Sequence, residues 1–169
     1  MRQSFGDLGL DDAPAAGYLV DLLVRFARTD ALYAVDAPAP RRLEGVVDAW
    51  LEIQAAWDAG APGFAPEREV RLRRHMGDYT LFMTGLFREH VERLAVAGYY
   101  EIEGRRAYRF VAETARARGE AEAGLFRRLA DRFEHFAGAL TYMRKVYLRV
   151  DGVPDDVAQA PLLRRLLQA

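Results

Sequence analysis

The chain has 169 residues, of which 51% are hydrophobic, and its formal net charge is −1 at pH 7. This length corresponds to one ordinary domain with a single core. The sequence has no Cys, which excludes disulfides, thiolate zinc sites and cysteine nucleophiles. Its only Ser is Ser4 and it has no Asn, which argues against a Ser-His-Asp hydrolase and against an Asn-bearing phosphoryl-transfer site.

The charge pattern and the hydropathy constrain the partners and the compartment. Basic and acidic residues are interspersed along the chain, so no overall basic field points to nucleic acid. No apolar run approaches the roughly 20 residues that cross a bilayer, and the N-terminus has no apolar signal core. We therefore expect a cytoplasmic protein with neither a membrane nor a nucleic acid as its partner.

Residues 1–14 form a polar lead-in that we expect to be flexible. Asp12 followed by Pro14 is typical of a helix start, because Pro is tolerated in the first turn. Apolar residues then recur at helical spacing from Leu19 to Phe26, which predicts the first helix.

Two further helices follow in the pattern. An amphipathic stretch over residues 43–57 predicts the second helix, between two Pro-containing links. Pro66 with Glu67 and Glu69 predicts the start of a third, since acids are favourable at the positive end of the helix dipole.

The third helix continues into RRHMGDYTLFMTGLF, residues 73–87. From residue 79 to residue 87 apolar side chains occupy every face, which indicates a central helix buried on all sides. Gly77 and Gly85 are placed to let a neighbouring helix approach closely on one face. A break at Thr84 or Gly85 is an equally allowed prediction.

Residues 126–150 carry the most regular pattern, with apolar residues alternating spacings of three and four. This period is that of a coiled-coil seam, but small residues flank it where a free-standing coil would place Glu and Lys. We predict one long helix that packs inside its own bundle, with a dimer seam as the alternative. The apolar positions are Phe126, Leu129, Phe133, Phe136, Leu140, Met143, Tyr147 and Val150.

Residues 86–110 admit two interpretations, and the choice between helix and wing for residues 98–110 stays open. In the first, they are the recognition helix and β-wing of a winged-helix DNA-binding regulator. In the second they are helical, with Gly104 and Ala107 as contact points for a neighbour. The arginines that would face phosphate in the first are Arg105, Arg106 and Arg109.

The segments YLVDLLVRF, RHMGDYTLFMTGLF, GRRAY and LFRRLADRFEHFAGAL resemble a family of bacterial proteins. That family is all-helical, has an LGD-x-x-LF-x-x-G-F/L-F signature and has no established activity. The resemblance covers roughly residues 18–145 and implies helices throughout. Similar members often carry Pro after the second Phe, where this chain has Arg88.

Arg74, His75 and Asp78 form the candidate site, because their spacing brings both basic side chains within reach of the carboxylate on a helix. They could supply a general base or a metal ligand oriented by Asp78, as in a small-ligand-binding or metal-binding protein or an enzyme. The structural alternative, which we favour, is a helix-internal ion pair where the central helix enters the core. The full set of ligand-binding candidates is Arg74, His75, Asp78, Tyr79 and His90.

The histidines do not predict a metal site. On one straight helix His75 and His90 would lie roughly 22 Å apart, so they could share a site only if the chain reversed near Gly85. His135 lies at the edge of the apolar seam of residues 126–150, and the chain has no paired Glu-x-x-His signature. We predict no metal and leave the cofactor unknown.

Together these patterns predict an all-α protein, a single-domain bundle of about six to seven helices with a central buried helix. The bundle would span residues 15–152, followed by a short amphipathic helix over residues 153–169 that packs on the bundle or on a partner. The leading functional hypothesis is a non-enzymatic interaction or regulatory module with a protein partner or homo-oligomer. The interaction candidates are Tyr142, Leu148, Leu163 and Leu167.

Overall fold

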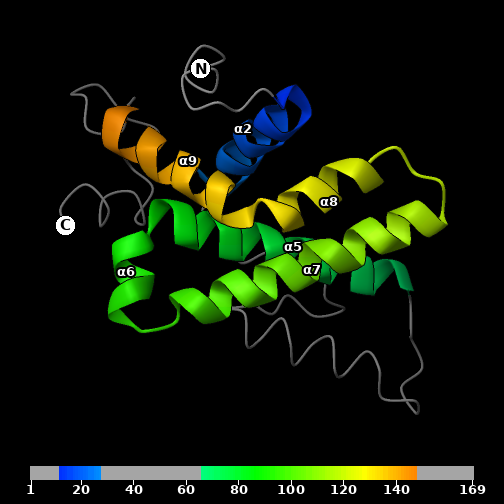
Figure 1. Ribbon diagram of the computed structural model, residues 1–169, viewed down its shortest axis with the longest axis horizontal. Helices are drawn as coiled ribbons and strands as arrows, with labels where there is room; N and C mark the ends of the chain where they lie inside the picture. The colour runs from blue at the N-terminus through cyan, green and yellow to red at the C-terminus, as the bar shows by residue number, and fades with distance from the viewer. Residues whose placement is uncertain (1–11, 28–65, 148–169) are drawn as a thin grey trace.

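The computed structural model describes residues 12–27 and 66–147. These residues form helices and no strand (Figure 1). The prediction of an all-α bundle is therefore confirmed for the described part of the chain. The helices are α2 (Ala13–Ala27), α5 (Pro66–Leu86), α6 (Arg88–Arg93), α7 (Ala97–Ala117), α8 (Ala123–Asp131) and α9 (Phe133–Tyr147).

Several predictions fall outside these residues. They are the helix over residues 43–57, the lead-in up to residue 11, the segment from residue 148 to the C-terminus, and the candidates Leu148, Leu163 and Leu167.

Helix α2 begins where the sequence predicts. Asp12 precedes it, and its carboxylate accepts a hydrogen bond from the backbone N–H of Ala15 at 3.1 Å. This bond satisfies one of the backbone donors left free in the first turn. Leu19, Leu22 and Phe26 then face the core, so the short polar start and the apolar face together fix how α2 lies on the bundle.

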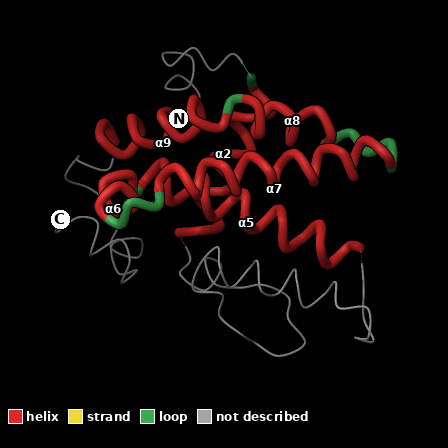
Figure 2. The backbone as a smooth tube through the Cα atoms, turned by 60° about the horizontal axis from the view of Figure 1, so that its bottom comes forward, coloured by secondary structure: helices red, strands yellow, loops and turns green. Residues whose placement is uncertain are grey.

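Helix α5 is the central element. Every residue from Met76 to Leu86 is buried, with α7 along one side and α9 along another (Figures 1 and 2). The hydroxyl of Thr80 donates to the carbonyl of Met76 at 2.8 Å, and that of Thr84 to the carbonyl of Thr80 at 2.7 Å, so both are satisfied inside the core. The predicted central buried helix is thus confirmed.

The chain turns after α5, and not within it. The helix continues through Thr84 and Gly85 and ends at Leu86, so the predicted break at these two residues is wrong. A β-carbon on Gly85 would lie 2.6 Å from the side chain of Leu140, which shows that this glycine allows α9 to pack against the α5 backbone. The glycine serves a close approach between helices, and the chain bends at Phe87.

The winged-helix alternative is wrong, because residues 97–117 form the single helix α7. Gly104 faces inward, where a β-carbon would lie 2.5 Å from the ring of Phe133. Ala107 and Tyr108 are buried on the same side. The helical interpretation, with Gly104 and Ala107 as contact points, is the one that the structure confirms.

The seam over residues 126–150 is divided between two helices, so the prediction of one long helix is wrong. Helix α8 ends at Asp131 and α9 begins at Phe133, with Arg132 between them at φ −113° and ψ 28°. This bend lets α8 pack against α7 while α9 packs against α5. The apolar positions that are described all face the core, as predicted for packing inside the bundle: Phe126, Leu129, Phe133, Phe136, Leu140 and Met143.

Candidate functional site

The candidate site is centred on the carboxylate of Asp78, halfway along α5. Its side chain is only 1% exposed, although a carboxylate in the core must be paired or hydrogen-bonded to be tolerated. The burial follows from its place in the central helix, against which α7 and α9 pack on two sides. The residues around it decide what this carboxylate can do.

Gly77 brings the first partner to Asp78. The ring of Tyr108 on α7 lies directly against Gly77, so that a β-carbon there would be 2.8 Å from two ring atoms. From that position the Tyr108 hydroxyl donates a hydrogen bond to Oδ1 of Asp78 at 2.8 Å. The Gly-Asp pair in the sequence thus works as one unit: the glycine makes room for the ring, and the next residue accepts its hydroxyl.

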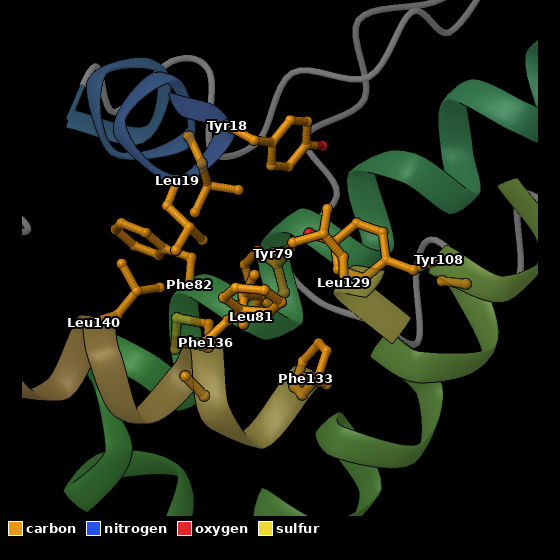
Figure 3. Close-up of a cluster of buried hydrophobic side chains, with 14 of the residues drawn as sticks. Tyr18, Leu19, Tyr79, Leu81, Phe82, Tyr108, Leu129, Phe133, Phe136 and Leu140 are labelled. Carbon is orange, nitrogen blue, oxygen red and sulfur yellow. The ribbon is translucent and has the colours of Figure 1, made fainter. Parts of the chain in front are cut away.

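Helix α2 brings two more partners. The hydroxyl of Tyr18 donates to Oδ1 of Asp78 at 2.5 Å, and the guanidinium of Arg25 donates to Oδ2 at 3.0 Å. Tyr18 and Arg25 are seven residues apart, so they lie on one face of α2. Figure 3 shows Tyr18 extending from α2 and Tyr108 from α7 into the same core cluster. The carboxylate therefore joins three helices that are distant in sequence.

The predicted helix-internal ion pair is corrected by this geometry. The groups that the described residues bring to the carboxylate of Asp78 are Tyr18, Arg25 and Tyr108, and neither Arg74 nor His75 is among them. Arg74 instead donates its Nε–H to the hydroxyl of Tyr18 at 3.3 Å. Packing of α2 and α7 against α5 brings the hydrogen-bond donors of Asp78 from other helices, and not from the neighbouring turn of α5.

Arg74 completes the outer side of the cluster. Its guanidinium lies 3.5 Å from the carboxylate of Glu122, and 5.4 Å from the centre of the Tyr18 ring. Arg25 lies near the same ring, at 5.7 Å. Two half-exposed guanidinium groups thus flank the tyrosine, where they are attracted to its π face.

The surroundings shift the pKa values of both tyrosines upward. Burial raises the pKa of the Tyr18 hydroxyl well above its ordinary value, and the negative charge of Asp78 adds to the effect. Burial also raises the pKa of Tyr108, again with a contribution from Asp78. Both hydroxyls therefore stay protonated and act as donors to the carboxylate.

The other candidate residues lie apart from this carboxylate. The ring of His75 packs edge-on to Phe26 at 5.9 Å, and Tyr79 is buried with its ring 6.1 Å from that of Tyr100. His90 is exposed on α6, beyond the end of α5. Within residues 12–27 and 66–147, no group of three His, Cys, Asp or Glu side chains could hold a metal ion.

The three arginines of the rejected wing all lie on α7. Arg105 forms an ion pair with Glu134 at 2.5 Å, and Arg106 with Glu103 at 2.8 Å. Arg109 is exposed. Two of these three charges are thus already matched by carboxylates of the bundle.

The sequence interpretation missed Tyr18, Arg25 and Tyr108 as members of the cluster. A weak signal existed on α2, where the spacing of seven puts Tyr18 and Arg25 on one face. For Tyr108 the signal was the Gly77-Asp78 pair, since a glycine inside a buried helix indicates close approach of a bulky neighbour. Neither signal identifies which residues far away in the sequence would meet.

Chemically, the cluster is suited to holding helices together. A carboxylate offers about four acceptor positions, and those of Asp78 receive two hydroxyls and one guanidinium. With its oxygens engaged by the protein itself, Asp78 has little capacity left to take a proton from a substrate or to coordinate a ligand.

Apolar side chains are also exposed, at the start of α7 and in the turn before it. Leu94 is 58% exposed, Ile102 51% and Tyr99 42%. The two residues on α7 are three apart and lie on the helix face opposite its buried side. The bundle therefore presents a local apolar surface beside its charged residues.

Searches for similar proteins gave no match to this chain among protein-family models, curated proteins or solved structures. None of the described helices is both long enough and apolar enough to cross a membrane.

Proposed function

We propose that the protein is a non-enzymatic interaction module that binds another protein chain through one face of α7. We call this surface the α7 outer face and define it by Tyr99, Ile102, Arg106 and Arg109, which lie on one side of the helix. The observation that carries the proposal is the exposure of two large apolar side chains on it, Tyr99 and Ile102. Large apolar groups gathered on a surface are typical of protein interaction sites, especially when charged residues border them.

The Asp78 cluster supports this proposal over a ligand site or an enzyme. A catalytic base needs a free acceptor within reach of its substrate, whereas Asp78 is buried and accepts bonds from Tyr18, Arg25 and Tyr108. The absence of Cys and Asn and the single Ser4 support it as well. We keep the cytoplasm as the proposed compartment, since a Cys-free chain needs no oxidising environment.

The proposed surface differs from the one that the sequence pattern favoured. Most of the apolar positions between residues 126 and 143 face the core and are not available to a partner. Tyr142 on α9 is 43% exposed and stays a separate candidate contact. The α7 outer face is preferred because two exposed apolar side chains, Tyr99 and Ile102, lie on one side of the same helix.

A photo-cross-linking experiment tests the proposal. A photoreactive amino acid is placed at Ile102 in the host cell, and at Val24 on α2 as the matched control, since Val24 is exposed and apolar but lies off the α7 outer face. We expect a discrete cross-linked species from position 102 alone, whose partner mass spectrometry identifies. Equal cross-linking from both positions, or none from position 102, would contradict the proposal.

The identified partner is then titrated against the purified protein. We expect Ile102→Glu to weaken binding about tenfold or more, because it places a charge at the centre of the apolar contact. Val24→Glu should leave the affinity unchanged. An affinity that is the same for both variants would show that the cross-link reported proximity and not a binding surface.

A further inference from the structure

We infer that the partner at the α7 outer face is a second copy of this chain, with the two α7 helices packed antiparallel across a two-fold axis near Ile102. A second copy is one partner for the interaction proposed above, so this dimer rests on that proposed function. The grounds are the order of side chains along the face and the charges that are left exposed on it.

The α7 outer face is a narrow stripe along one helix. Tyr99, Ile102, Arg106 and Arg109 are separated by three, four and three residues, so they follow one side of α7. The opposite side is occupied by the protein's own core, where Gly104 and Tyr108 pack against α5 and α9. Tyr99 is 42% exposed and Ile102 51% exposed, so a partner that lies along this stripe contacts accessible side chains.

The stripe complements itself when two copies run antiparallel. With the axis between residues 102 and 103, Tyr99 lies opposite Arg106, and the two Ile102 side chains lie next to each other, displaced by one residue, about 1.5 Å, along the helices. A guanidinium over a tyrosine ring is a favourable pair, and Arg106 is well exposed although it also contacts Glu103. In this arrangement Ile102 packs against Ile102, and each Tyr99 ring contacts the Arg106 guanidinium of the other copy.

One further residue, Gly98, fits this arrangement. Gly98 lies one turn before Ile102, and a β-carbon there would meet nothing within 4 Å, so a second helix can approach closely at this point.

A parallel pair would fit less well. It would place Arg106 against Arg106 and Arg109 against Arg109, and like charges that face each other disfavour association. Tyr99 would then meet tyrosine instead of guanidinium. The charges therefore select the antiparallel orientation.

The absence of Cys in the native chain allows a direct test with single cysteines in the full-length protein. Ile102→Cys, Val24→Cys and Tyr142→Cys are treated with a mild oxidant, and disulfide-linked dimer is measured over time. We expect Ile102→Cys to cross-link about a hundredfold faster than Val24→Cys, because a dimer holds its two thiols at millimolar effective concentration. Equal rates for Ile102→Cys and Val24→Cys would overturn the dimer, and faster cross-linking of Tyr142→Cys would place the interface on α9.

The orientation is tested by mixing two variants. In a mixture of Tyr99→Cys and Arg106→Cys chains, we expect the mixed disulfide to form faster than either homodisulfide. A dominant Arg106→Cys homodisulfide would show a parallel pair and overturn the antiparallel assignment.

The failure of this dimer and the failure of the proposed function give different results. A photo-cross-link from position 102 to a different protein, with no rapid disulfide from Ile102→Cys, would overturn the dimer and leave the interaction module standing. The loss of both signals would overturn both.

Discussion

At the scale of single residues, the close packing of Tyr108 against α5 requires that residue 77 has no side chain. Gly77→Ala would place a methyl group 2.8 Å from the Tyr108 ring, and such overpacking costs about 1–3 kcal/mol. Gly138→Ala on α9 is the control, because nothing lies within 4 Å of its added β-carbon. We expect that control to raise the free energy of unfolding by about 0.5–1 kcal/mol, as alanine favours helix.

Denaturant unfolding of the two variants measures this difference. Opposite signs of the change in unfolding free energy are expected. If Gly77→Ala were as stable as Gly138→Ala, the close contact between Tyr108 and α5 would not matter for stability.

The two tyrosines at Asp78 predict a loss of stability at alkaline pH. Folding raises the pKa of Tyr18 and Tyr108 above the ordinary value of 10.0, so the folded state holds protons that the unfolded state has released. Their contribution is therefore complete below about pH 10 and is lost as the pH rises above it. We expect the free energy of unfolding to fall along that range.

Urea unfolding between about pH 8 and pH 12 tests this dependence. Tyr108→Phe should cost about 1–3 kcal/mol at neutral pH, because Asp78 loses a donor, and should flatten the alkaline decline. Tyr142→Phe, on the surface of α9, is the control and should change neither. An alkaline slope that Tyr108→Phe leaves intact would contradict the assignment to this cluster.

At the scale of elements, α6 and α7 end in the same motif with different residues. The N–H of Val96 donates to the carbonyl of Val91 and that of Ala95 to Glu92, and the corresponding pairs after α7 are Glu120 with Ala115 and Gly119 with Arg116. This is a Schellman motif, whose central residue is left-handed. That residue is Ala95 at φ 56° in one case and Gly119 at φ 70° in the other.

Substitutions at Ala95 and Gly119 are expected to change the free energy of unfolding in opposite directions. Ala95→Gly should raise the free energy of unfolding by about 0.5–1 kcal/mol, because glycine adopts positive φ without a steric penalty. Gly119→Ala should lower it by a similar amount. Thermal unfolding of the two variants checks this, and a destabilised Ala95→Gly would mean that the Ala95 side chain makes a contact that outweighs its strain.

At the scale of the whole molecule, burial predicts a gradient of local stability. α5 is covered along Met76 to Leu86, whereas in the six-residue helix α6 only Val91 is buried. Amides of central elements exchange only through large openings, and those of weakly covered elements exchange through small ones. We expect the slowest hydrogen exchange in the second half of α5 and much faster exchange in α6. Similar protection of the two helices would contradict the central place of α5.

The helices themselves were largely predictable, because they depend on local signals. Pro66 with Glu67 and Glu69 predicted the start of α5, and the apolar run after Asp78 predicted that it would be buried. The choice between wing and helix for residues 98–110 stayed open, since Gly104 fits a turn as well as a close helix contact. The structure distinguishes the two, because residues 97–117 form one helix in which Gly104 packs against Phe133.

What the sequence by itself determined is the helical class, the central buried helix, and which face of each described helix is apolar, since these follow from periodicity within one segment. Tertiary structure decided the bend at Arg132, where a single apolar seam had to face α7 and then α5. It also decided that Asp78 meets Tyr18 and Tyr108 instead of Arg74. Such contacts depend on how the helices pack against one another, and the spacing of residues within one segment does not determine that packing.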